Sequence, residues 1–131
     1  MEFAIFGALT SVGALFIFLG VSMKIAIIGS RGLHVENLGE YLPEGVTEIV
    51  SGGAKGIDTD AENYARDNNI ITTIFLPDYS RYGRGAPIVR NKQIVDYADE
   101  VIAFWDGKSR GTKSVIDYCK KQNKNIIVIT M

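Results

Sequence analysis

The sequence predicts an α/β protein with a Rossmann-like three-layer fold around a mostly parallel five-stranded sheet. From Met23 onward, short runs of β-branched residues alternate with polar segments of helical period, which is typical of βαβ units. Glycine-containing turns follow three of these runs at the point where a helix is expected to begin. At 131 residues and 47% hydrophobic, the chain is long enough for one domain with a substantial core.

Five runs are predicted to be strands that are apolar on both faces, as buried parallel strands are. They are Lys24–Ile28, Thr47–Val50, Ile70–Leu76, Glu100–Phe104 and Asn125–Thr130. The segments between them predict helices near Val35–Leu42, Ile57–Asn68, Pro87–Tyr97 and Thr112–Gln122.

Two of these helices have a clear apolar stripe, and a third begins with a proline in its first turn. The first stripe consists of Ile57, Ala61, Tyr64 and Ala65, and the second of Val115, Ile116 and Cys119. Both stripes predict helices that lie against the sheet.

The composition narrows the function classes. With one cysteine, Cys119, and one histidine, His34, the chain has neither a disulfide framework nor the Cys/His spacing of a zinc site. We therefore predict no metal and no cofactor, and a reducing, cytoplasmic location. The net charge of −1 favours neither nucleic acid nor an anionic membrane surface.

Residues 1–22 form a separate apolar N-terminal segment. The uncharged run from Phe3 to Val21 is about long enough to cross a bilayer as a helix. One interpretation is a membrane anchor. The other is a misassigned start codon, because Met23 stands directly before the first predicted strand. Both stay open, and the predicted globular domain is 23–131.

The glycine-rich turn Ser51–Asp58 has the features of an anion site. Its glycines let a ligand approach the backbone, and the following helix presents unpaired N–H groups at its positive dipole end. Similar turns lie at Gly29–Gly32 and Asp106–Thr112. Right-handed crossovers bring all three turns to the carboxyl edge of the sheet, where open α/β sheets bind ligands.

The positions of the basic residues along the chain support a ligand that carries phosphate. Nine of the 14 basic residues lie in or beside the turns of this edge: Arg31, Lys55, Arg81, Arg84, Arg90, Lys92, Lys108, Arg110 and Lys113. A positive pole of this kind focuses the field on an anionic ligand. The segment Pro77–Ala86 leaves the third strand at the same edge, where we expect it to act as a lid or clamp.

The turns are neither a Walker A loop nor a G-x-G-x-x-G fingerprint. In order along the chain, the motifs are Gly29-Ser30-Arg31, Ser51-Gly52-Gly53-Ala54-Lys55-Gly56-Ile57-Asp58, Arg90-Asn91-Lys92 and Arg110-Gly111-Thr112. This arrangement resembles the SLOG superfamily, which includes DNA-processing protein A, the Lonely-Guy phosphoribohydrolases and small stand-alone bacterial proteins. The resemblance implies binding of a nucleotide or of a nucleotide sugar such as ADP-ribose, and it implies self-association.

The resemblance fails at the position that carries catalysis in the phosphoribohydrolases. Their Pro-Gly-Gly-x-Gly-Thr-x-x-Glu stretch ends in a catalytic glutamate, and alignment on Gly111-Thr112 places Val115 there. Valine cannot transfer a proton, so the sequence favours a sensor or carrier over an enzyme. Two alternatives stay open: a nucleotide N-glycosidase or phosphoribohydrolase that uses Asp58 as its acid, and a single-stranded DNA-binding protein.

Glycine-turn backbones, basic side chains and short polar side chains make up the predicted ligand site. Its residues are Gly29, Ser30, Arg31, Ser51, Gly52, Gly53, Ala54, Lys55, Gly56, Asp58, Arg90, Asn91, Trp105, Asp106, Ser109, Arg110, Gly111 and Thr112. Some of these have alternative interpretations: Asp58 is a helix cap or a ribose ligand, and Trp105 stacks on a base or covers the core.

Overall fold

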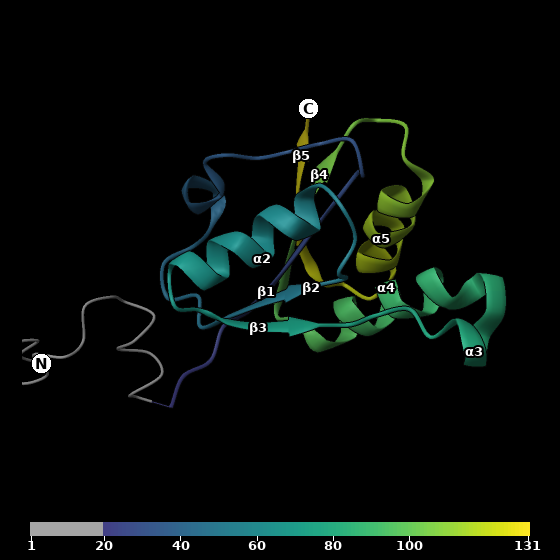
Figure 1. Cartoon of the computed structure of the whole chain (residues 1–131), viewed down its shortest axis with the longest axis horizontal. Helices are drawn as coiled ribbons and strands as arrows, with labels where there is room; N and C mark the ends of the chain where they lie inside the picture. Colours follow the sequence, from purple (N-terminus) through teal and green to yellow (C-terminus); the bar gives the residue numbers. More distant parts are fainter. Residues whose placement is uncertain (1–19) are drawn as a thin grey trace, which may run out of the picture.

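The protein is described by a computed structural model in which residues 20–131 are placed (Figure 1). Most of the predicted N-terminal segment 1–22 lies outside this range. The strands are β1 (Lys24–Gly29), β2 (Glu48–Ser51), β3 (Ile71–Ile74), β4 (Glu100–Trp105) and β5 (Asn125–Thr130). The helices are α2 (Ile57–Asp67), α3 (Tyr79–Tyr82), α4 (Ala86–Tyr97) and α5 (Arg110–Lys121), with 3-10 turns η2 (Leu38–Tyr41) and η3 (Gly83–Gly85).

All five strands are parallel, in the order β3-β2-β1-β4-β5, which confirms the predicted α/β class. α2 and η2 lie on one face of the sheet, whereas α4 and α5 lie on the other (Figure 1). The strand order reverses between β1 and β4, so the loops that follow these two strands diverge. Such a position is where open α/β sheets bind ligands.

The core lies in two layers, one on each face of the sheet. Under α2, the buried stripe Ile57, Ala61 and Ala65 packs against β1 and β2, as its spacing predicted. Phe104 of β4 is fully buried in this layer, and Tyr41 of η2 meets its ring edge-on at 5.2 Å between centroids.

The second layer joins α4 and α5 to the opposite face. Val115, Ile116 and Cys119 of α5 pack there with Ile94 and Val95 of α4, as the apolar stripe of α5 predicted. Burial raises the pKa of the Cys119 thiol to about 11.

The predicted helix near Val35–Leu42 is wrong, because only η2 forms there. Gly39 and the proline that follows Leu42 leave little chain for regular helix. The N–H of Val35 donates instead to the Asp60 carboxylate of α2 at 2.8 Å, which ties this loop to α2.

The prediction that all five strands are buried on both faces holds for β1, β2 and β4 but is wrong for the two edge strands, β3 and β5. Residues Ile71 and Ile74 of β3 and Ile127 and Val128 of β5 are exposed. An edge strand has a neighbour on one side only, so the helix layers above and below cover it incompletely.

The segment Pro77–Ala86, for which the sequence predicts a lid or clamp, forms α3 and η3 beside α4. The Asp78 side chain caps α3 by accepting from the Arg81 N–H. Tyr79 and Tyr82 are exposed, and neither lines the pocket described below.

Within residues 20–131, no helix is both long and apolar enough to cross a membrane.

The turn after β1 packs directly on the start of α2. A Cβ atom added to Gly29 would overlap the Ile57 side chain, and one added to Gly56 would overlap the Arg31 carbonyl oxygen. Gly56 also has a φ of 78°, which side-chain-bearing residues rarely adopt. These contacts decide how close the first two turns of the carboxyl edge lie.

Replacing Gly29 with alanine tests this packing. Overpacking against Ile57 should lower the free energy of unfolding by roughly 1–3 kcal/mol. The measurement is urea unfolding, with Gly32→Ala as the control, because a Cβ atom at Gly32 meets nothing within 4 Å. Equal stability of the two variants would contradict the close approach.

Candidate functional site

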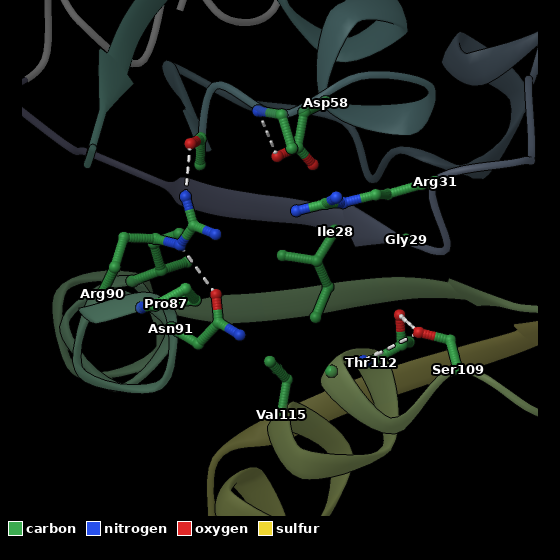
Figure 2. Close-up of a pocket in the computed structure, with 14 residues that line it drawn as sticks. Ile28, Gly29, Arg31, Asp58, Pro87, Arg90, Asn91, Ser109, Thr112 and Val115 are labelled. Carbon is green, nitrogen blue, oxygen red and sulfur yellow. Dashed lines mark hydrogen bonds between the residues drawn. The ribbon is translucent and has the colours of Figure 1, made fainter. Parts of the chain in front are cut away.

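A pocket opens at the carboxyl edge of the sheet, between the turns after β1 and β2 and the N-termini of α2, α4 and α5 (Figure 2). Its volume is about 140 Å³. It is lined by Ile28, Gly29, Arg31, Gly52, Ala54, Asp58, Pro87, Arg90, Asn91, Ile94, Ser109, Gly111, Thr112 and Val115. Separate parts of the predicted site therefore meet in one cavity.

Of the two arginines that line the pocket, Arg31 is the one that makes no hydrogen bond or ion pair with other described residues. Its side chain extends from the turn after β1 across the mouth of the pocket, between Asp58 and Ile28 (Figure 2). Among the described residues no carboxylate lies within 4.0 Å of its guanidinium, and no hydrogen bond holds it. Arg31 therefore forms no ion pair with another of the described residues.

Arg90 is partly committed to the fold. Its Nη1 donates to the Gly52 carbonyl and, at 3.5 Å, to the Phe75 carbonyl, while its Nε donates to Asn91 Oδ1 at 2.8 Å. Burial lowers the pKa of Arg90, and the nearby Asp58 charge opposes that shift. Figure 2 shows the other terminal nitrogen directed toward the pocket, on the side where Arg31 lies.

Asp58 forms part of the pocket wall. Its Oδ2 accepts from the Ala54 N–H at 3.0 Å, which ties the first turn of α2 to the glycine turn before it. The residue is 7% exposed, and burial raises the pKa of its carboxyl; the Ala54 hydrogen bond and the Arg90 charge oppose this shift. A buried carboxyl beside a cationic pocket can accept a hydrogen bond or, when protonated, donate one.

The N-terminus of α5 supplies short polar groups. Ser109 caps the helix by accepting from the Thr112 N–H at 3.4 Å, and its hydroxyl lies 3.3 Å from Thr112 Oγ1. A Cβ atom added to Gly111, between these two residues, would meet nothing within 4 Å, so the Gly111 backbone is open to the pocket. Helix N-termini of this kind favour anions.

Four apolar residues of the pocket were not predicted: Ile28, Pro87, Ile94 and Val115. Each lies within a few positions of a predicted residue, on the strand or helix that carries it. Val115, aligned with the catalytic glutamate of the phosphoribohydrolases, thus presents methyl groups to the pocket. Helical spacing from Thr112 could have indicated this position.

Eight predicted residues lie outside the pocket lining: Ser30, Ser51, Gly53, Lys55, Gly56, Trp105, Asp106 and Arg110. Lys55 and Arg110 are exposed, and Ser51 is buried with its hydroxyl 3.2 Å from the Glu62 carboxylate. These residues shape the turns or face solvent.

The loop after β4 is held by its own polar groups. Asp106 Oδ1 accepts from the Lys108 and Ser109 N–H groups at 2.8 and 2.7 Å, and these bonds lower the pKa of Asp106. The N–H of Asp106 also donates to Ser30 Oγ at 3.3 Å, which joins this loop to the β1 turn. Trp105 packs over the second core layer and donates to the Ser109 carbonyl, so its covering role is the one seen.

Few of the basic residues predicted to form the positive pole line the pocket itself. Only Arg31 and Arg90 of the nine basic residues line the pocket. Lys113 pairs with Asp117 one turn along α5, and Lys92 lies over the Tyr118 ring, so both charges are engaged within the fold. The described residues contain no group of three or more His, Cys, Asp or Glu side chains that could hold a metal ion.

Comparison with protein-family models, with curated proteins and with solved structures found no match to this chain. The likeness to the SLOG superfamily therefore stays a prediction from motifs. The pocket is identified by its position and by the chemistry of its lining.

Replacing Asp58 with asparagine tests the buried carboxyl through the pH dependence of stability. Because the folded-state pKa is raised, the contribution of Asp58 to stability is complete below the unfolded value, near 3.8, and is lost as the pH rises through the folded pKa. The stability of Asp58→Asn relative to the wild type should therefore increase as the pH rises above about 3.8.

Urea unfolding between about pH 3.5 and about pH 7, a range that begins near the reference pKa of aspartate, measures this difference. Asp67→Asn, which removes an exposed carboxylate of the same helix, is the matched control. A difference between Asp58→Asn and the wild type that does not change with pH would contradict the raised pKa.

Proposed function

We propose that this protein binds a nucleotide or nucleotide sugar of the ADP-ribose or NAD type at the carboxyl edge of its sheet and acts as a cytoplasmic sensor or carrier. The observation that carries this proposal is the pocket in which Arg31, Arg90 and the N-terminus of α5 converge. A cavity with two arginines and an open helix start is suited to a phosphate group.

The phosphate would lie between the Arg31 guanidinium and the start of α5. Arg31 has all its donors available among the described residues, and its planar fork suits two phosphate oxygens. Gly111 lets an oxygen approach the backbone without meeting a side chain. Arg90 would add charge from the opposite wall while it keeps its bond to the Gly52 carbonyl.

The remaining groups favour an attached sugar. Asp58 can accept from a ribose hydroxyl, the Asn91 amide offers a donor on the other side, and Ile28 and Val115 provide an apolar surface. The volume of about 140 Å³ is below that of pockets that enclose drug-sized ligands. We infer that phosphate and sugar enter the pocket and that the base lies at its mouth.

Binding is favoured over catalysis by the lining itself. It includes one carboxyl group, that of Asp58, and no histidine or cysteine. The hydroxyls of Ser109 and Thr112 contact each other, and no base lies within hydrogen-bonding distance of either among the described residues. A nucleophile with an adjacent base and an orienting group is therefore not assembled in the described pocket.

Thermal unfolding against AMP, ADP-ribose, NAD, cyclic nucleotides and short single-stranded DNA tests the ligand class. A ligand at about 100 times its dissociation constant adds roughly 2.7 kcal/mol, a shift of several degrees for a domain of this size. Arg31→Ala should weaken binding by about tenfold or more, because it removes charge-assisted bonds. Arg66→Ala, at an exposed arginine near the far end of α2, is the matched control.

A shift with a nucleotide that is reduced in Arg31→Ala and kept in Arg66→Ala would support the proposal. A shift with DNA alone, and one that falls steeply with salt, would contradict it and favour the single-stranded DNA-binding alternative.

The raised pKa of Asp58 favours a second candidate, a nucleotide N-glycosidase or phosphoribohydrolase in which Asp58 is the general acid. This candidate predicts release of free base over time from a bound nucleotide. Asp58→Asn should then lower the rate by about 100-fold or more, the range of general acid catalysis, and Asp67→Asn should leave it unchanged. Chromatography of the products measures the rate, and absence of free base would exclude this candidate.

A further inference from the structure

The strand β5 leaves one complete edge of the sheet without a partner in the described chain. All six of its residues, Asn125–Thr130, are in regular parallel register with β4. On its outer side the structure describes no further strand, and Ile127 and Val128 are 52% and 38% exposed. The outer edge of β5 thus combines exposed apolar side chains with backbone groups that no described strand pairs.

The register shows which backbone groups point outward. The N–H of Met131 donates to the Trp105 carbonyl at 2.9 Å. The backbone N–H and C=O groups of the odd-numbered residues therefore point toward β4. Because strands alternate with a period of two, the N–H and C=O groups of Ile126, Val128 and Thr130 point away from the sheet. A second strand would satisfy these groups directly.

β5 lacks three of the features by which edge strands avoid pairing. Its sequence, NIIVIT, contains no charge and no proline, and its register has no bulge. The opposite edge strand, β3, is only four residues long and has Pro77 shortly after its end. The two edges of the described sheet therefore differ, and β5 presents the longer uncharged strand for pairing.

We propose that β5 pairs antiparallel with β5 of a second copy of this chain, around a two-fold axis at Val128. In this register Val128 faces Val128 of the other copy, and Ile126 faces Thr130, each as a hydrogen-bonded pair. A two-fold axis perpendicular to the sheet keeps the α2 face of both copies on the same side. The two sheets then form one continuous sheet.

The side chains suit this pairing on both faces. Ile129 packs with the α2 layer and Ile126 with the α5 layer. The side chains at odd-numbered positions of β5 therefore lie on the α2 face of the sheet, and those at even-numbered positions lie on the α5 face. Ile127 therefore faces Ile129 of the other copy on the α2 face, and the two Val128 side chains meet on the α5 face. Both pairs are β-branched, and no like charges oppose each other.

Disulfide cross-linking of the full chain tests the register. Facing residues of a hydrogen-bonded antiparallel pair have Cα atoms about 5.5 Å apart, within the range of disulfides. Val128→Cys should form a covalent dimer under mild oxidation. The natural Cys119 is buried, so it should not compete for this disulfide. Ile71→Cys, at an exposed position of the other edge strand, is the matched control and should cross-link far more slowly.

Analytical ultracentrifugation provides the second test. Val128→Lys places two like charges at the axis and should raise the dimer dissociation constant by about tenfold or more. Ile71→Lys, the same type of change on β3, should leave the constant unchanged. A dimer that cross-links at Val128 and is weakened only by Val128→Lys supports the proposal. A monomeric wild type overturns it. So does a dimer that neither cross-links through Val128→Cys nor is weakened by Val128→Lys.

Discussion

The arrangement of the site depends on the close contact between the end of β1 and the start of α2. Gly29 and Gly56 lack the Cβ atoms that would meet Ile57 and the Arg31 backbone, so the helix begins almost in contact with the central strand. This contact sets the distance between the first two turns of the carboxyl edge. It also carries Asp58 into the wall of the pocket and directs Arg31 across its mouth.

The charged residues of the pocket differ in how many hydrogen bonds they make to the rest of the protein. Arg90 uses its donors to hold the Gly52 carbonyl and the Asn91 amide, and Asp58 uses one oxygen to hold the Ala54 N–H. Arg31 has no such commitment among the described residues. A half-buried arginine and a buried carboxyl are thus held in the pocket wall by hydrogen bonds, whereas no such bond holds Arg31 among the described residues.

Ten of the residues predicted to bind a ligand line the pocket, and eight do not. Those that line it come from the turns after β1 and β2, from the first two turns of α4 and from the N-termini of α2 and α5. The others lie outside the lining for local reasons: Asp106 binds its own loop, and Trp105 packs inward over the core. A motif shows which backbone forms a turn, but not whether a side chain points toward the ligand or toward the fold.

The sequence by itself determined the alternation of strands and helices, the parallel sheet and the edge at which the glycine turns gather, because these follow from local periodicity and from the handedness of crossovers. Only the tertiary structure decided the rest. It bound the Val35 N–H to the Asp60 carboxylate of α2, placed Val115 in the pocket and put β5 at the edge of the described sheet. These outcomes depend on which strand neighbours which and on contacts between residues far apart in the chain, and neither is encoded in a local pattern.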